Sequence, residues 1–166
     1  MGSTAIRCKR IFELLILEDT QAGLSWITIL CKRTNYRSTF DEFEPARITL
    51  YVTDKIDSLL QDAGIVRNRL KVETAEKNAQ QFLEVRAESG DFAAFMWQFV
   101  SGMPKQNSWK YIADIPSNTP KSVAMSKELK RRGFKFVSPT IYYALMQTIG
   151  MVNDHTKDSF RHKELQ

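Results

Sequence analysis

The sequence predicts an all-α fold, and three observations support this class. Apolar residues recur at helical spacing over most of the chain. At two places a capping residue stands directly before a proline, which is typical of helix starts. The run at 48–52 has a β-like composition, but a lone strand has nothing to pair with. With 166 residues, 43% of them hydrophobic, the chain can bury a proper core, and we predict one domain over residues 1–166.

Two helices are predicted in the N-terminal part of the chain. Residues 9–18 are apolar almost all round, which indicates a buried helix starting near Lys9. Apolar and aromatic residues then recur at helical spacing from Trp26 to Phe40. We expect Gly23 to separate these two helices.

A helical hairpin is predicted over residues 59–71. Thr53 is a candidate N-cap for a third helix, which Gly64 ends. A long fourth helix follows, with Val66 and Leu70 at the start of its apolar stripe. A fifth helix is expected directly after Asp91, with a phenylalanine-rich face in the core.

The second half of the chain begins with a predicted loop. Residues 101–120 hold three prolines and little periodicity. Thr119-Pro120 and Ser138-Pro139 then predict two helix starts, and we place the C-terminal helices within residues 120–153. Gly133 is well placed to end the first of them. Residues 154–166 are expected to form a tail.

Composition limits the function without naming it. The net charge is +5, from 24 Lys and Arg against 19 Asp and Glu, which permits binding to a phosphate backbone but also fits a solvated basic surface. Two cysteines make no disulfide framework, and no complete metal-ligand spacing occurs. The apolar stretch at 11–17 is too short to span a bilayer, and no cleavage site follows it. We therefore expect an intracellular, cytoplasmic protein without membrane contact.

The predicted hairpin is a candidate DNA-binding element. The amides that begin its second helix are unpaired within that helix and lie at the positive end of its dipole, so a phosphate could bind there. The residues predicted to contact the DNA backbone are Gly64, Val66, Arg67, Asn68, Arg69 and Lys71. The alternative is an ordinary antiparallel helix pair with a solvated basic face.

A second candidate site lies at the end of the first helix. Glu18, Gln21 and Trp26 bring together a carboxylate, an amide and an aromatic ring, which are the groups that a flipped base needs for hydrogen bonding and stacking. Taken alone, Glu18 is better explained as a solvated carboxylate at a helix end, and Trp26 as a core residue.

Four segments in order, spread over residues 9–159, resemble the DNA-3-methyladenine glycosylase I family. They are LEDTQAGLSWITIL, DAGIVRNR, FAAFMWQFVSGMP and KELKRRGFKFVSPTIYYALMQTIGMVNDH. The resemblance implies a helix-hairpin-helix DNA glycosylase-like helical bundle that acts in base-excision repair. It also implies a monofunctional enzyme, acting as a monomer on double-stranded DNA with alkylated bases, in which water replaces 3-methyladenine without a cofactor.

The resemblance also assigns roles to individual residues. It makes Glu18 the catalytic pocket carboxylate that recognises the methylated base, and Trp26 the pocket tryptophan; Gln21 is kept as a base-binding candidate from its residue type alone. N3-methylated adenine is cationic, so a carboxylate attracts it more than it attracts normal adenine. Leu24 is a candidate for the gap left in the duplex, although packing in the core is the simpler role.

This chain departs from the family pattern at several positions. Family members carry a DP-x-Y-x-x-Y-H-D-x-x-W-G segment that supplies aromatic residues and a histidine for a structural zinc, whereas here Cys8 runs directly into Lys9. Cys8 and His155 match two zinc ligands, but Ser159 stands where a third ligand, cysteine, is required. We therefore expect no tightly bound zinc.

Two smaller features complete the comparison with the family pattern. Asn68 replaces a histidine that the family carries in the hairpin, and phosphate binding through backbone amides should survive that change. His162 is interpreted as a polar residue of the C-terminal tail.

Three functions follow as alternatives. The first is an active 3-methyladenine glycosylase. The second is a catalytically impaired, DNA-binding remnant of that family, favoured by the absent segment. The third is a helical protein-interaction module, which rests on the fold class alone.

Overall fold

The computed structural model describes residues 2–164, and the side chains of residues 8–164. The elements in chain order are α1 (Gly2–Gln21), α2 (Trp26–Thr39), η1 (Asp41–Phe43), α3 (Pro45–Ile48), α4 (Thr53–Gln61), α5 (Arg69–Ser89), α6 (Phe92–Trp97), η2 (Gln98–Val100), β1 (Lys105–Gln106), η3 (Ile112–Asp114), α7 (Pro120–Arg131), α8 (Pro139–Thr148), β2 (Val152–Asn153) and α9 (Phe160–Glu164). The predicted all-α class is confirmed.

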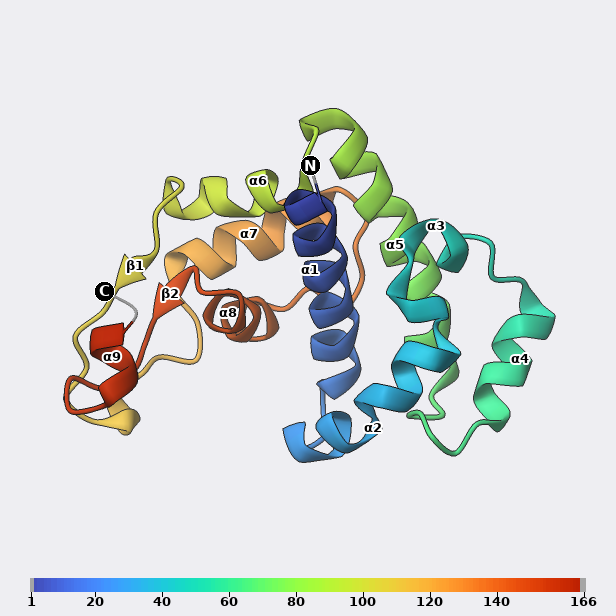
Figure 1. Cartoon of the computed structure of the whole chain (residues 1–166), viewed down its shortest axis with the longest axis horizontal. Helices are drawn as coiled ribbons and strands as arrows, with labels where there is room; N and C mark the ends of the chain where they lie inside the picture. The colour runs from blue at the N-terminus through green and yellow to red at the C-terminus, as the bar shows by residue number, and fades with distance from the viewer. Residues whose placement is uncertain (1, 165–166) are drawn as a thin grey trace.

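Helix α1 lies in the middle of the molecule. Figure 1 shows α2, α3, α4 and most of the long α5 on one side of it, and α6, α7, α8 and the C-terminal elements on the other, with α5 running behind α3. Every side chain from Ile11 to Thr20 is buried, so α1 contacts neighbours all round, as its apolar sequence predicts. One hydrophobic cluster joins both sides, and Phe12 of α1 packs on Phe82 of α5 within it, with 4.9 Å between ring centroids.

Helix starts depend on local capping, and the sequence predicted most of them. The side chains of Asp91, Thr119 and Ser138 accept hydrogen bonds from the first-turn amides of α6, α7 and α8. Thr53 was wrongly placed, because Val52 occupies the cap position without a side-chain bond and Thr53 is already helical. Gly133 has a φ of 97° just after α7, which a residue with a Cβ rarely adopts.

Several predicted boundaries were wrong. Helix α1 begins at Gly2 and runs through Cys8 and Lys9 without a break, since extending a formed helix costs little. Val66 precedes α5, which begins at Arg69, and Leu70 is exposed instead of packed in the core.

The C-terminal part also differs from expectation. Residues 101–120 include β1, which pairs in parallel with β2 through Lys105 and Val152, so the region is more than a loop. Helix α8 ends at Thr148, short of the predicted 153. His162 is buried within the short helix α9 and is therefore not a polar tail residue. The run at 48–52 forms the end of α3 and a turn.

Candidate active site

Glu18 is a buried carboxylate in the last turn of α1. Only 4% of its surface is exposed, which excludes the simpler interpretation of a solvated helix-end residue. Burial raises the pKa of Glu18 to about 7, and the hydroxyl of Thr148, 3.5 Å from Oε1, opposes that rise. A carboxylate with this pKa carries a negative charge only near and above neutral pH.

A cavity of about 810 Å³ runs along the same face of α1. Ile11 and Leu14 of α1 line it, and Glu18 lies four residues after Leu14, which places it on this face one turn further on. Thr148 and Trp97 line the cavity from α8 and α6. Because the hydroxyl of Thr148, which lines the cavity, lies 3.5 Å from Oε1 of Glu18, the site combines an apolar wall with a buried acidic group.

The loop after α1 places the other predicted site residues differently. The side-chain amide of Gln21 donates to the carbonyl oxygen of Leu24 at 2.7 Å, so it closes the turn between α1 and α2. Leu24 is 37% exposed, which makes core packing the wrong interpretation of this residue. Trp26 is half-buried at the start of α2 and packs on the core.

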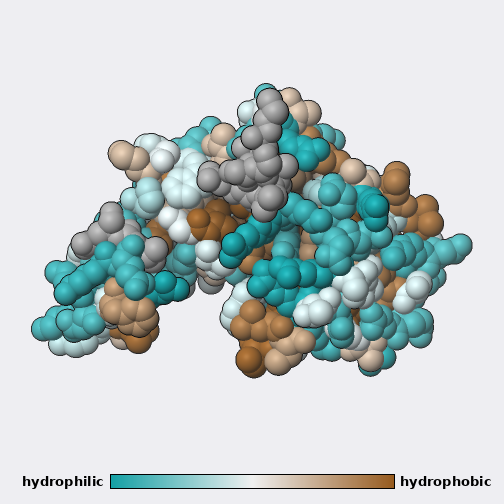
Figure 2. All heavy atoms as spheres, viewed as in Figure 1, coloured by the Kyte–Doolittle hydropathy of each residue, from teal (hydrophilic) through white to brown (hydrophobic). Residues whose placement is uncertain are grey.

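Exposed apolar side chains continue from this loop onto α2. Ile27 is 65% exposed and Leu30, one turn later, is also exposed. In Figure 2 apolar atoms gather at the lower centre, where the α1–α2 connection lies, on a face that is otherwise mostly hydrophilic. The outline of the molecule is indented between this region and the C-terminal elements.

The predicted hairpin is present as α4, a turn over residues 62–68, and α5. The turn is held by side chains: the amide of Gly64 donates to Oδ1 of Asp62 at 2.6 Å, and the amide of Val66 donates to the hydroxyl of Tyr36 at 2.9 Å. A Cβ on Gly64 would lie 2.4 Å from the side-chain nitrogen of Asn35, so the turn packs closely against α2. The amides of Gly64 and Val66 therefore already have hydrogen-bond acceptors within the protein and are not free to bind a phosphate.

The remaining hairpin residues differ in what they can offer a phosphate. Asn68 is the N-cap of α5, and its side chain accepts from the amide of Lys71 at 3.2 Å. Arg69 forms ion pairs with Asp57 and Glu73. Arg67 is exposed, and within residues 8–164 neither its side chain nor its backbone amide has a hydrogen-bond partner. The amides of Arg69 and Leu70 likewise donate to no residue in that range, which leaves three backbone donors for an anion.

Lys71 is not directed to solvent as the sequence suggested. Its ammonium group donates to the carbonyl oxygens of Thr20 and Ala22, each at 2.6 Å. Burial lowers the pKa of Lys71, and the nearby carboxylate of Asp19 opposes that change. This cation is thus bound to the end of α1.

The residues predicted as remnants of a zinc site do not fit that metal. The thiol of Cys8 donates to Oδ1 of Asp91 at 2.6 Å, and burial together with this carboxylate raises the pKa of the thiol. Zinc needs the thiolate. His155 is exposed, and in the part of the chain that the structure describes no group of three or more His, Cys, Asp or Glu side chains could hold a metal ion. The structural zinc that the resemblance implied is not supported by this residue set.

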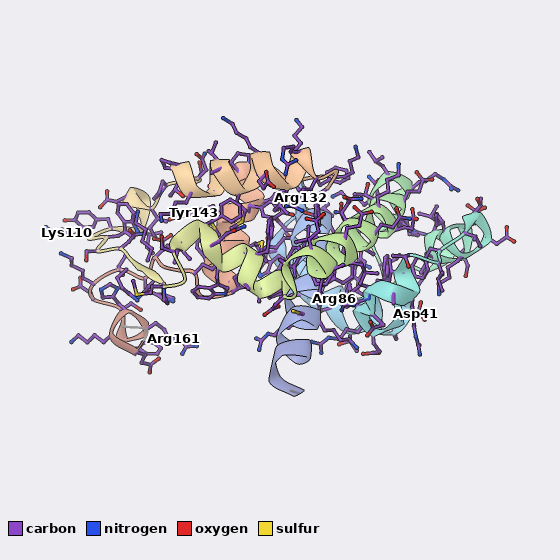
Figure 3. The ribbon with its side chains drawn as sticks, turned by 90° about the horizontal axis from the view of Figure 1, so that it is seen from above. Asp41, Arg86, Lys110, Arg132, Tyr143 and Arg161 are labelled. Carbon is purple, nitrogen blue, oxygen red and sulfur yellow. The ribbon has the colours of Figure 1, made fainter. Side chains whose placement is uncertain are left out.

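Two buried carboxylates escaped the sequence analysis. Asp19 is adjacent to Glu18, and burial raises its pKa well above its ordinary value. Asp154 accepts hydrogen bonds from Asn107, Trp109, Tyr143 and Gln147, and these bonds outweigh burial and hold its pKa below the ordinary value. Figure 3 shows Tyr143 pointing into the body of the molecule, whereas Lys110 and Arg161 lie at its outer edge. In the sequence, the only sign of Asp19 was a polar residue at the end of a nearly apolar helix, and the only sign of Asp154 was the NDH motif.

Comparison with known proteins identifies the family. A family model described as methyladenine glycosylase matches residues 2–162. The chain belongs to the methyladenine glycosylase family. It is 44% identical to DNA-3-methyladenine glycosylase 1 of Escherichia coli over 147 residues, which cover 89% of this chain and 79% of that protein.

Solved structures of methyladenine glycosylases agree with this assignment. A crystal structure of 3-methyladenine DNA glycosylase I matches with a TM-score of 0.89 and 44% identity, covering 92% of this chain and 84% of that one. A variant of 3-methyladenine DNA glycosylase I in complex with 3-methyladenine matches with a TM-score of 0.89 and 35% identity, covering 92% and 82%. The fold of this chain is therefore that of the methyladenine glycosylases.

Proposed function

We propose that this methyladenine glycosylase releases 3-methyladenine from alkylated double-stranded DNA by hydrolysis of the N-glycosidic bond. The observation that carries the proposal is the buried carboxylate of Glu18 beside a cavity with an apolar wall. A cationic base entering this site gains a strong attraction to the carboxylate, because the buried carboxylate is poorly screened by solvent. Normal adenine is neutral and gains much less.

Glu18 is suited to a cationic base for a second reason. Its pKa of about 7 means that the empty site is protonated for part of the time at neutral pH. A positive charge nearby stabilises the carboxylate, so binding of the methylated base lowers this pKa and ionises the group. The departing base is already a good leaving group, and water then attacks C1′ of the sugar. Discrimination thus comes from a charge that only the damaged base carries.

The hairpin supplies the contact to the DNA backbone in this proposal. The exposed cation of Arg67 and the amides of Arg67, Arg69 and Leu70 face no partner within residues 8–164. A backbone phosphate binds there independently of the DNA base sequence, as a repair enzyme requires. The exposed Leu24 is available to fill the position from which the base has left the duplex.

The decisive experiment measures release of free 3-methyladenine from methylated duplex DNA under single-turnover conditions. We expect release by the wild-type chain, and for Glu18→Gln a fall of roughly 10²-fold or more, because removing a charged group that stabilises the transition state costs about 3 kcal/mol. Undamaged duplex is the control substrate, and its affinity should be the same for both proteins. Equal release by Glu18→Gln and wild type contradicts the role of Glu18.

The alternative of a DNA-binding remnant predicts a different result in the same assay. Such a protein binds duplex with a salt-dependent affinity but releases no base. Duplex binding that is absent or insensitive to salt contradicts both proposals and favours a protein-interaction module.

A further inference from the structure

The last turn of α1 carries two acidic residues. Glu18 and Asp19 are adjacent, both are buried, and the helix carries no basic residue in its last turn. The carbonyl groups at a helix C-terminus add the negative end of the helix dipole. In their ionised forms these two groups destabilise the turn unless a positive group from elsewhere in the chain contacts it.

That positive group is Lys71, which reaches α1 from the first turn of α5. Its ammonium bridges the carbonyl oxygens of Thr20 and Ala22 at 2.6 Å each. An α-helix leaves its final carbonyl groups without partners inside the helix, and a cation is the stronger kind of donor for them. The same ammonium is close enough to Asp19 to oppose the rise of its pKa. Lys71 therefore caps α1.

A second residue of α5 holds the same turn. Asn78 lies seven residues after Lys71, hence on the same face of α5, and is completely buried. Its side-chain nitrogen donates to Oδ2 of Asp19 at 2.8 Å, and its side-chain oxygen accepts from the amide of Lys135 at 2.8 Å. The space enclosed between Asp19, Lys71 and Asn78 measures only about 10 Å³. The end of α1 is thus fixed to α5 at two points.

We propose that Lys71 is a positioning residue that fixes Glu18 relative to the DNA-binding hairpin, and that it is not a phosphate ligand. Arg67 and the free amides lie within four residues of Lys71, so the element that holds the DNA backbone is tied directly to the turn that carries Glu18. A base held by Glu18 and a backbone held by the hairpin are thereby kept at one fixed separation. The inference rests on the proposed role of Glu18 in binding the base.

The test compares Lys71→Met with Arg67→Met, which each remove one positive charge from the same hairpin. Affinity for undamaged duplex is measured over a range of salt concentrations, and base release is measured in single turnover at saturating protein. For Arg67→Met we expect weaker duplex binding, with a salt slope smaller by about 0.9, the contribution of one phosphate contact. For Lys71→Met we expect an unchanged slope and a release rate lower by roughly 10- to 100-fold, because small misplacements of a catalytic group have effects of this size.

Lys71→Arg keeps the proposal testable if Lys71→Met does not fold. A phosphate ligand tolerates arginine, whereas the small space beside Asp19 does not accommodate a guanidinium group in the place of the ammonium. We expect Lys71→Arg to bind duplex with the wild-type salt slope but to release base more slowly by at least roughly tenfold. Wild-type release by Lys71→Arg, or a reduced salt slope in Lys71→Met, overturns the positioning role.

The two proposals fail in different ways. A wild-type chain that releases no base overturns the proposed function. The positioning role of Lys71 is then tested by two measurements: the salt slope of duplex binding, and the affinity for free 3-methyladenine measured by calorimetry. The affinity for free 3-methyladenine must weaken in Lys71→Met. If that binding is unchanged, the positioning role is wrong.

Discussion

Glu18 shows how strongly its surroundings determine what a residue can do. In the sequence it is an acidic residue at the end of an apolar stretch, a position where most carboxylates are solvated. In the structure it is buried near Thr148 and beside a cavity, and its pKa rises to about 7. A carboxylate kept in this state costs stability, which is common for groups that serve a function.

That cost leads to a pH dependence of stability. The pKa of Glu18 is about 7 in the folded protein and 4.5 ordinarily, so the native state retains a proton that the unfolded chain releases. The stabilisation that this bound proton gives the folded protein is complete below about pH 4.5 and is lost as the pH rises towards about 7. We expect the free energy of unfolding to fall over this range by about 3 kcal/mol more in the wild type than in Glu18→Gln.

Urea unfolding at a series of pH values measures this difference. Asp19 has a raised pKa as well, so Glu18→Gln should keep a smaller slope of the same sign. Parallel curves for the two proteins would show that Glu18 is ionised throughout and would refute the assignment of its pKa.

At the scale of elements, capping side chains determine where helices begin. The sequence predicted the starts of α6, α7 and α8 because a cap acts over three residues and needs no tertiary contact. It missed Asn68 as the cap of α5, since the residue was interpreted only as a substituted position in a DNA-binding motif. The same asparagine limits the hairpin, because it occupies the amide of Lys71.

Substitution of Asn68 separates capping from DNA binding. We expect Asn68→Ala to lower the free energy of unfolding by about 1 kcal/mol, because the amide of Lys71 loses its acceptor. Asn68→Asp keeps an acceptor and should retain wild-type stability, but it should weaken duplex binding by charge repulsion. Chemical denaturation and binding to undamaged duplex measure the two effects. Wild-type duplex affinity in Asn68→Asp would mean that phosphate does not approach this turn.

At the scale of the whole molecule, α1 connects two groups of helices. Figure 1 shows it between the hairpin side and the C-terminal side, and the cavity next to Glu18 is lined from both α1 and the C-terminal elements. On the C-terminal side, Asp154 binds side chains from the segment before α7 and from α8. One carboxylate thus keeps an irregular segment in contact with the wall of the cavity.

Loss of this carboxylate should loosen the C-terminal side. Asp154→Asn places a donor among four donors, and we expect the free energy of unfolding to fall by roughly 2–4 kcal/mol. The exposed Asp158 offers a matched control, since Asp158→Asn removes the same charge from the same region without a buried partner. Denaturation and limited proteolysis within residues 101–119 measure the effect. Equal stability of the two variants would contradict the importance of the Asp154 network.

The sequence by itself determined the helical class, most helix starts and the hairpin position, and it singled out Glu18 as a candidate site residue, because periodicity, capping and family motifs are local properties. Only the tertiary structure decided that Gln21 closes a turn, that Cys8 bonds to Asp91, and that Lys71 binds the end of α1. These partners lie up to 83 residues apart along the chain. Which donor meets which acceptor across such separations depends on how the helices pack, and residue type alone does not encode it.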